Sequence, residues 1–337
     1  MDCGIVALDR LLSDATAPPI PPDAREAVSA VQALLIGHGY QGLPTLLAPS
    51  CGTFGPRTQG ALRHFQTTHQ LAMTGAMDGP TVQHLVSEPA DAPIASRLYV
   101  ACVLNVEFSL LVRLATVTMQ LEGGGYFSAA NWNTDRCGLS FGLIQWAQRP
   151  GRLHELLAAF NQADPAQLVA ILGAGQADVA QGLLAHTAKP NGGVDPATGR
   201  TLDPRFDLVS QPWRNRFLAA GHEKAFQRAQ IMTAQAAFST SAQHIRSTMP
   251  LITTERGLVF MLDVANQFGD AGASRLAANA ARPGMTEADF LAAVGQASVA
   301  AVTRQYGDGS AAARSTASRR DTVRTTPWLT DTPVALS

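Results

Sequence analysis

The feature that most constrains the fold is a short pattern that occurs twice between residues 25 and 88. Each copy has a turn that contains glycine, then a proline and a threonine, then apolar residues at helical spacing. Proline is tolerated in the first turn of a helix, so each copy predicts a loop that leads into a helix. We therefore expect a compact helical unit here. The two copies comprise Gly52–Thr58 with Ala61, Leu62 and Phe65, and Gly75–Thr81 with Leu85.

Two proline-containing segments mark the borders of this unit. The sequence APPIPPD ends the first 24 residues and predicts a stiff connector, and SEPADAPIAS predicts a polar linker. The end of the chain is rich in Ser, Thr and Arg, so it is expected to wrap the surface or fray. The expected divisions are an N-terminal extension (1–24), the helical unit (25–88), a linker (89–96), a second domain (97–305) and a C-terminal tail (306–337).

The composition favours a folded, mainly helical protein. Hydrophobic residues make up 46% of the chain, charged residues 15% and aromatic residues 6%, and this scarcity of aromatic residues argues against an all-β architecture. The net charge of −1 provides no basic field for nucleic acid or for an anionic membrane, so neither is expected as a partner.

Metal ions and cofactors are not expected either. The histidines show no HxxxH pattern with a partnering Glu, and the four cysteines form no CxxC motif. Free thiols that pack as small hydrophobic groups are the simplest interpretation of these cysteines. A disulfide remains open if the protein works outside the cytoplasm.

The chain changes character after residue 97. Leu98–Leu121 is apolar but contains two charged residues, so it predicts buried helix, in one piece or two, rather than a membrane span. Three glycines end this stretch. Residues 126–147 combine aromatic residues and turn formers, which predicts a short, irregular β-hairpin region. Helical patterns return from 152 to about 305, so the expected fold is mainly α, with an α+β second domain.

Residues 25–88 resemble the small peptidoglycan-binding domain family over nearly all of their length. The resemblance implies a three-helix bundle that binds the glycan strand and stem peptide of peptidoglycan in a shallow groove. An alternative is that the module has become a spacer. The residues that carry the resemblance are Val31–Leu35, Gly39, Tyr40, Gly52–Gly55, Thr58, Ala61, Leu62, Phe65, Gln66, Leu71, Gly75, Asp78, Thr81 and Leu85.

The strongest chemical signal in the second domain is Glu122, which follows the apolar helical stretch. Cleavage of a glycosidic bond needs a proton donor, and a carboxylic acid serves near neutral pH only when its pKa is raised. Desolvation and the negative end of a helix dipole both favour the protonated form at such a position. A second carboxylate must attack the sugar or activate water, and Asp135 is the candidate.

This arrangement resembles the lysozyme superfamily, in which a Glu at a helix end precedes a small β region that lines the cleft. In detail, Asp135, Gly138, Ser140 and Gly142 resemble the chitosanase branch of that superfamily. The resemblance implies that Glu122 is the acid, that Asp135 is the base and that the Ser140 hydroxyl helps to hold the attacking water. Residues 262–269 also resemble a helix of that branch.

Two departures from the chitosanase pattern put chitosan as the substrate in doubt. Cys137 stands where that pattern has Arg, and the spacing from Glu122 to Asp135 is shorter. Because a module resembling peptidoglycan-binding domains precedes this domain, we expect the glycan strand of peptidoglycan to be the substrate.

Further polar and aromatic residues are candidates for sugar binding. Several of these positions also have a plain structural interpretation, because Asp135 could be a turn former, Trp146 a core residue and Asp263 a helix-packing residue. The expected substrate-binding residues are Tyr126, Asn131, Gln145, Trp146 and Asp263.

Four functions fit these features. The first is a muramidase-like hydrolase that inverts, with Glu122 as acid and Asp135 as base. The second is a lytic transglycosylase that uses Glu122 alone. The others are a chitosanase and a non-catalytic wall-binding protein.

The sequence also bears on location. The start of the chain has no basic region followed by an apolar run, so no secretory signal is expected, although peptidoglycan lies outside the cytoplasmic membrane. A protein of this kind would be made in the cytoplasm and act in the periplasm or cell wall. Release of a phage endolysin through a holin and delivery of a bacteriolytic effector by a secretion machine both fit. An effector would require an immunity protein as a further partner.

Overall fold

The computed structural model is mainly helical and contains one small sheet, which confirms the expected fold class. No helix within the described part of the chain is long and apolar enough to cross a membrane. The chain forms two compact units. Unit 1 comprises Met1–Leu46, Ser50–Phe108 and Glu122–Ala234, and unit 2 comprises Leu47–Pro49, Ser109–Leu121 and Gln235–Ser337. The structure describes residues 3–87, 90, 94–122 and 124–336, without the side chain of Glu122.

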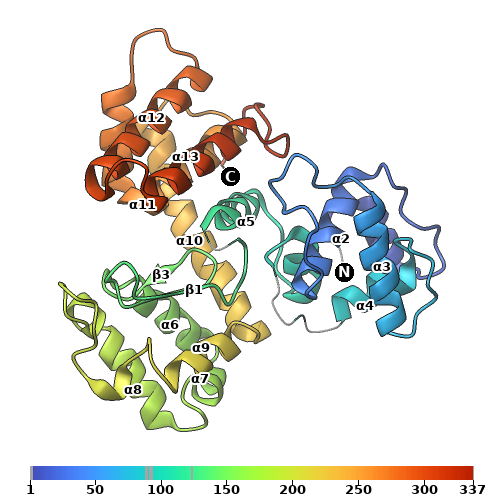
Figure 1. Ribbon diagram of the computed structural model, residues 1–337, viewed down its shortest axis with the longest axis horizontal. Coiled ribbons are helices and arrows are strands. Elements are labelled where there is room, and N and C mark those ends of the chain that lie inside the picture. The colour runs from blue at the N-terminus through green and yellow to red at the C-terminus, as the bar shows by residue number, and fades with distance from the viewer. Residues whose placement is uncertain (1–2, 88–89, 91–93, 123, 337) are drawn as a thin grey trace. The chain divides into compact units, whose positions relative to one another are not determined.

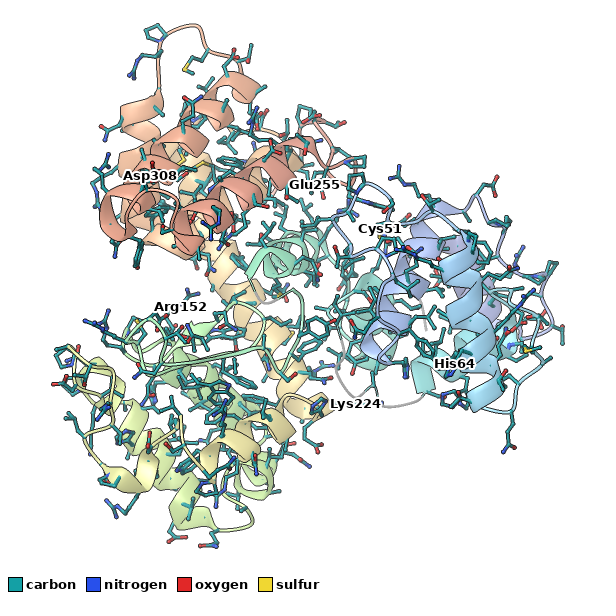
Figure 2. The ribbon with its side chains drawn as sticks, viewed as in Figure 1. Cys51, His64, Arg152, Lys224, Glu255 and Asp308 are labelled. Carbon is teal, nitrogen blue, oxygen red and sulfur yellow. The ribbon has the colours of Figure 1, made fainter. Side chains whose placement is uncertain are left out.

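The first part of unit 1 is a bundle of helices, which we call the module (Figure 1). Helix α2 (Arg25–Gly37) packs against α3 (Pro56–Thr68) and α4 (Gly79–Ser87), and these are the three helices that the sequence predicts. Pro56 occupies the first turn of α3. Figure 2 shows His64 on α3 and Cys51 in the loop that leads into this helix.

Residues 1–24 are more than an extension. They contain helix α1 (Val6–Ser13), which packs against α4 of the module. The side chains of Leu8 and Leu11 are fully buried, and the Gln83 amide donates a hydrogen bond of 2.9 Å to the Leu11 carbonyl. The expected border at residue 25 is therefore wrong, because the apolar face of α1 needs the module to cover it.

The repeated sequence pattern corresponds to a structural repeat built on two buried glutamines. Gln32 of α2 accepts a hydrogen bond from the Gly52 N–H (2.8 Å) and donates one to the Thr58 hydroxyl (2.8 Å). Gln66 of α3 makes the same pair of bonds in the next loop. It accepts from the Gly75 N–H (2.8 Å) and donates to the Thr81 hydroxyl (2.9 Å).

Each glutamine thus ties a loop glycine to the threonine that begins the next helix. Both glycines have positive φ angles, +75° at Gly52 and +66° at Gly75, which L side chains rarely adopt. The two connections differ in length, because Gln32 lies 26 residues before its threonine whereas Gln66 lies 15 residues before its own. The first connection is therefore longer by 11 residues.

The remainder of unit 1 contains the sheet. After the short π-helix η1 (Tyr99–Val103) and the Gly123–Gly125 segment, three strands pair antiparallel in the order β1-β2-β3. This confirms the expected β region. Asn131 lies opposite Ser140, and Phe141 lies opposite Trp146. The strands are β1 (Ala130–Trp132), β2 (Leu139–Phe141) and β3 (Trp146–Ala147).

One face of this sheet packs on helices. Phe141 contacts the ring of Phe217, with centroids 5.3 Å apart, and that of Phe226 at 6.1 Å, while Phe160 lies 4.9 Å from Phe226. These buried rings form the core beneath the strands. The helices of this region are α6 (Arg152–Ala163), α7 (Pro165–Ile171), α8 (Ala177–Thr187), α9 (Trp213–Ala220) and the start of α10 (Lys224–Thr248), with 3-10 turns η2 (Pro190–Gly193) and η3 (Pro204–Phe206).

Unit 2 is helical throughout its described residues. It contains α5 (Leu110–Glu122) up to Leu121, the later part of α10, α11 (Glu255–Ala280), α12 (Glu287–Tyr306) and α13 (Ala311–Thr325). The Arg113 guanidinium of α5 pairs with the carboxylate of Glu255, which is labelled in Figure 2 at the start of α11. This ion pair links α5 to a helix more than 130 residues later in the chain.

The expected C-terminal tail is wrong. Helix α13 lies within the segment expected to wrap or fray, and it packs against α12 and α11. Val323 is fully buried, and Arg320 is buried despite its charge. The high content of Ser, Thr and Arg conceals one face of this helix that belongs to the core of unit 2.

Candidate functional site

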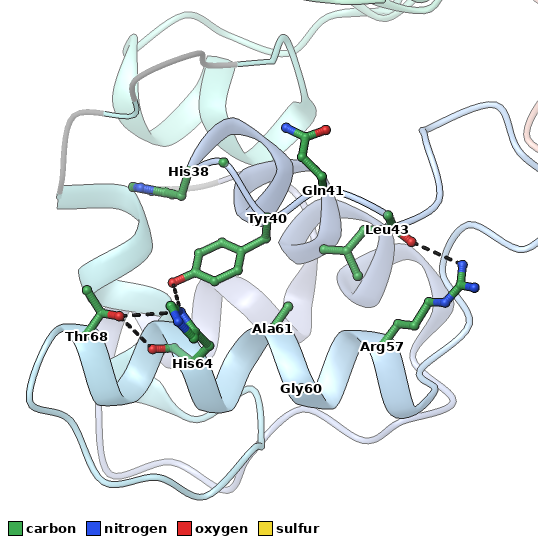
Figure 3. A pocket seen from close by; sticks show the side chains of 11 residues that line it. His38, Tyr40, Gln41, Leu43, Arg57, Gly60, Ala61, His64 and Thr68 are labelled. Atoms are coloured by element: carbon green, nitrogen blue, oxygen red, sulfur yellow. Dashed lines mark hydrogen bonds between the residues drawn. The ribbon is translucent and has the colours of Figure 1, made fainter.

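The module carries a pocket of about 680 Å³ above α3 (Figure 3). A volume of this size is in the range of pockets that bind small ligands. One wall comes from the loop after α2 and the other from the exposed side of α3. The lining residues are His38, Gly39, Tyr40, Gln41, Gly42, Leu43, Arg57, Gly60, Ala61, His64 and Thr68.

The centre of the pocket is a pair formed by Tyr40 and His64, whose side chains point toward each other in Figure 3. The Tyr40 hydroxyl lies 3.2 Å from His64 Nδ1, and the two rings meet edge to face with centroids 5.5 Å apart. Tyr40 also contacts the ring of Phe65, which lies in the core. Burial raises the pKa of Tyr40, so its hydroxyl stays protonated and able to donate a hydrogen bond.

A second pocket of about 540 Å³ continues the first along the start of α3. The two pockets share Gly42, Leu43 and Arg57, so we call them together the groove. Arg57 therefore stands at the junction, where its guanidinium lies 3.4 Å from the Gly42 carbonyl. Among the described residues that line the groove, Arg57 is the sole Lys or Arg, and none is Asp or Glu.

The groove depends on the longer connection of the structural repeat. Residues 39–44 and Ser50 line the two pockets, and all of them lie in the first connection, which exceeds the second by 11 residues. The sequence analysis used Tyr40 as a family landmark but not as a site residue, and it overlooked Arg57 and His64. The unequal length of the two repeats is the signal that would have indicated them.

The other candidate site lies in unit 1 around the small sheet. Helix α5 ends at Glu122, as the sequence predicts, but the side chain of this residue lies outside the described part of the structure. Asp135 lies in the turn between β1 and β2 and is exposed. Its Oδ1 accepts a hydrogen bond of 3.0 Å from the Cys137 N–H.

The turn that carries Asp135 is held by Asn133. The Oδ1 atom of Asn133 accepts from the Gly138 N–H (2.9 Å), and its Nδ2 donates to the Thr198 carbonyl (3.0 Å). Asn133 and Arg136 both have positive φ angles, of 67° and 61°. The turn is thus fixed at both ends, so the carboxylate of Asp135 has a defined position at the surface.

The sheet separates the remaining predicted residues onto two faces. Because opposite residues of antiparallel strands share a face, Asn131 and Ser140 lie together, and Trp146 lies with Phe141. Ser140 is 3% exposed. Trp146 is 1% exposed and packs in the core, so the expected sugar contact by Trp146 is wrong.

Three other predicted sugar-binding residues have structural bonds of their own. Asn131 Oδ1 accepts from the Thr134 N–H (2.9 Å), and the Gln145 amide donates to the Ala129 and Gly142 carbonyls (3.2 and 3.0 Å). The backbone of Tyr126 forms an isolated bridge with Ile94, and burial raises the pKa of its hydroxyl. All three side chains are half-buried, and their contact with substrate stays a prediction.

Asp263 has a different place. It lies on α11 in unit 2, is 0% exposed, and pairs with the guanidinium groups of both Arg319 and Arg320 on α13. A side chain without exposed surface cannot touch a glycan, so the expected substrate contact by Asp263 is wrong. Its role is to pair buried charges, which is the packing alternative that the sequence left open.

Neither metal binding nor thiol chemistry stands out near the sheet. Within the residues that the structure describes, no group of three or more His, Cys, Asp or Glu side chains is arranged to hold a metal ion. Cys137 is half-buried, and burial together with the negative charge of Asp135 raises the pKa of its thiol. It is therefore a poor thiolate nucleophile.

Comparison with known proteins identifies the module. Residues 24–85 match a family model described as a putative peptidoglycan binding domain. No curated protein matches the chain significantly. The match spans α2, α3 and α4 and both connections between them, including the groove-forming loop. Residues 24–85 are therefore a peptidoglycan-binding domain, which supports a role for the protein at the cell wall.

Proposed function

We propose that the protein binds peptidoglycan through the groove of its N-terminal module. The observation that carries this proposal is the continuity of the two pockets around Arg57, in a domain whose family binds peptidoglycan. Together the pockets offer a long, open surface rather than a closed cavity, which suits a polymer better than a small molecule.

The lining of the groove matches the chemistry of the wall. Sugar units present apolar faces and hydroxyl groups, for which the ring and hydroxyl of Tyr40 and the polar atoms of His64 are suitable partners. Stem peptides carry carboxylates, which a guanidinium binds through two parallel hydrogen bonds. Because Arg57 has no acidic neighbour in the described lining, its charge is available to such a group.

Cosedimentation with purified sacculi tests this proposal. Tyr40→Ala removes both the ring and the hydroxyl, and we expect it to weaken binding about tenfold, in keeping with buried aromatic contacts at interfaces. Arg57→Gln should weaken binding several-fold and reduce its dependence on salt. Arg63→Gln is the matched control, because Arg63 is exposed on the same helix but does not line the groove. Equal binding of all variants would refute the groove as the site.

We further propose that unit 1 is a glycoside hydrolase that cleaves the glycan strands of peptidoglycan. One observation favours this second function. Helix α5 ends at Glu122, and a small antiparallel sheet with an exposed Asp135 in its first turn follows directly. This order of helix end, sheet and acidic turn agrees with the lysozyme-like pattern that the sequence resembles.

In this proposal Glu122 protonates the leaving oxygen and Asp135 activates the attacking water. Inversion requires the two carboxyl groups to stand roughly 6.5–9.5 Å apart, so that a water molecule fits between Asp135 and the sugar. Ser140 would hold this water. The lytic transglycosylase alternative needs Glu122 alone and no external water, because the sugar closes on itself to form an anhydro product.

Zymography on purified peptidoglycan separates these roles. We expect Glu122→Gln to abolish clearing and Asp135→Asn to reduce it by a factor of 100 or more, the upper part of the range for general acid–base catalysis. Glu223→Gln and Asp178→Asn are matched controls, because both carboxylates are exposed in the same unit away from the sheet. Full activity of Glu122→Gln would eliminate this assignment, and full activity of Asp135→Asn alone would favour the transglycosylase.

The route to the wall is part of the proposal. We infer that the protein acts in the periplasm or cell wall after release with a phage holin or delivery by a secretion machine. In the second case an immunity protein would protect the producing cell. Expression in the cytoplasm and, with an added export signal, in the periplasm distinguishes a toxic effector from a harmless wall-binding protein, because only exported wild type should lyse the cell.

A further inference from the structure

Two of the four cysteines are neighbours although they lie far apart in the sequence. The Cys3 thiol forms a hydrogen bond with the thiol of Cys102, which lies in η1. Both residues are buried, with exposures of 1% and 6%. All four cysteines are free thiols in this structure.

The backbone around this pair is held in place by Arg97. Its guanidinium donates hydrogen bonds to the carbonyls of Cys3 and Gly4, the latter at 2.9 Å, and pairs with Glu26 at 2.9 Å. On the other side, the Cys3 N–H donates to Asp9 Oδ1 at 2.6 Å. Gly4 has a φ of +68°, and a side chain at this position would collide with Arg97. These contacts fix the segment that carries Cys3 against the start of η1.

The other two cysteines have different surroundings. Cys51 is fully buried, and its thiol lies 3.8 Å from the Gln32 side-chain oxygen, inside the first loop of the repeat. Cys137 lies in the turn beside Asp135 and is half-buried. The pair formed by Cys3 and Cys102 is thus set apart by a direct contact between two thiols.

We propose that Cys3 and Cys102 form a redox-controlled disulfide, which is open in a reducing compartment and closed in an oxidising one. The oxidant is a low-molecular-weight or protein disulfide. One cysteine attacks it as a thiolate and forms a mixed disulfide, and the second then displaces the oxidant's remaining sulfur. Two electrons pass to the oxidant, which leaves as two thiols, and the two cysteine protons balance them.

The disulfide would close a loop that contains the entire peptidoglycan-binding module. A loop of about 100 residues is near the upper end of the range in which a cross-link restricts the unfolded chain and so stabilises the fold. The module would therefore be reinforced on arrival at the wall, where disulfides persist. This consequence rests on the proposed function, whereas formation of the bond does not.

The environment of Cys3 also predicts how the bond forms. The hydrogen bond from Cys102, burial and Asp9 raise the pKa of the Cys3 thiol, so little thiolate is present near neutral pH while the segment is docked. Oxidation should therefore be slow in the folded protein and faster during refolding or in mild denaturant. This behaviour makes the pair a switch that responds to the compartment in which folding is completed.

The test is a disulfide map of the full chain after equilibration with oxidised and reduced glutathione. We expect one cross-linked peptide pair that contains Cys3 and Cys102, with Cys51 unmodified and Cys137 reduced or glutathionylated. Oxidation should raise the midpoint of thermal unfolding by roughly 5–10 °C, and dithiothreitol should reverse this change. If Cys3 and Cys102 remain separately alkylatable under these conditions, or pair with other cysteines, the proposal fails.

Variants provide the matched control. Cys3→Ala and Cys102→Ala should each remove the redox-dependent change in the unfolding midpoint, while Cys51→Ala and Cys137→Ser should retain it. The wild-type map decides the question even if a variant folds poorly. Because sacculus binding is a separate measurement, a missing disulfide with intact binding would overturn this inference alone, and a disulfide without binding would overturn the proposed function alone.

Discussion

At the scale of single residues, the module depends on two buried side-chain amides. Gln32 and Gln66 each satisfy a loop N–H and a threonine hydroxyl that burial would otherwise leave unpaired. An unsatisfied buried polar group costs about 1–3 kcal/mol. These bonds explain why the two loops have equivalent anchors although they differ in length.

Gln32→Ala and Gln66→Ala should therefore each lower the free energy of unfolding of the module by about 2–3 kcal/mol. The measurement is urea unfolding followed by tryptophan-independent far-UV circular dichroism. Gln59→Ala on α3 is the control and should change stability by less than about 0.5 kcal/mol, because its amide holds no loop. Similar stabilities of all three variants would contradict this explanation of the repeat.

A second prediction at this scale concerns Asp263. Its carboxylate compensates the charges of Arg319 and Arg320, both largely buried in unit 2. Asp263→Asn removes the negative charge while keeping the shape, and it should destabilise unit 2 by about 3–5 kcal/mol. Asp321→Asn, at an exposed position on α13, should have little effect in the same thermal unfolding experiment. Loss of wall binding with unchanged stability would instead restore Asp263 as a substrate residue.

At the scale of elements, the small sheet is fastened to α10 by another glutamine. The fully buried Gln230 accepts a hydrogen bond from the Leu143 N–H (3.1 Å) and donates one to the Phe127 carbonyl (3.0 Å). Gln148 binds the other end of the sheet, through the Leu139 N–H (3.1 Å) and the Gly192 carbonyl (2.8 Å). Both side chains hold irregular backbone that has few ladder bonds of its own.

Gln230→Leu should loosen the segments around Phe127 and Leu143 without unfolding the helices. Hydrogen exchange of the peptides that cover residues 127–145 should become at least tenfold faster, and glycan cleavage should fall with it. Gln235→Leu, a half-buried position on the same helix, should leave that exchange unchanged. Unchanged exchange in both variants would show that the sheet does not depend on Gln230.

The elements also show what the sequence could and could not predict. Helices α3 and α4 begin where proline and threonine indicate, and the sheet lies where turn formers and aromatic residues gather, because these signals are local. Helices α1 and α13 were missed because their polar faces dominate their composition. Asp263 and Trp146 were misassigned because an apolar or charged residue type does not reveal burial. The groove was overlooked because its residues come together only through the longer loop.

At the scale of the whole molecule, the compact units differ from the expected domains. Helix α5 follows the linker directly in sequence, yet it belongs with helices of the last hundred residues through pairs such as Arg113 with Glu255. The module and the sheet, expected as separate domains, share unit 1. Such long-range pairing cannot be obtained from hydrophobic periodicity, which records only the neighbours along one helix or strand.

The central claim is that one chain both binds and cleaves peptidoglycan. The most direct measurement is mass spectrometry of the muropeptides that wild type and Glu122→Gln release from purified sacculi, with cosedimentation of the same samples. We predict that wild type releases muropeptides with reducing ends, and that Glu122→Gln binds sacculi equally well but releases none. Binding by both proteins without release by either would contradict the claim and leave a wall-binding protein without hydrolase activity.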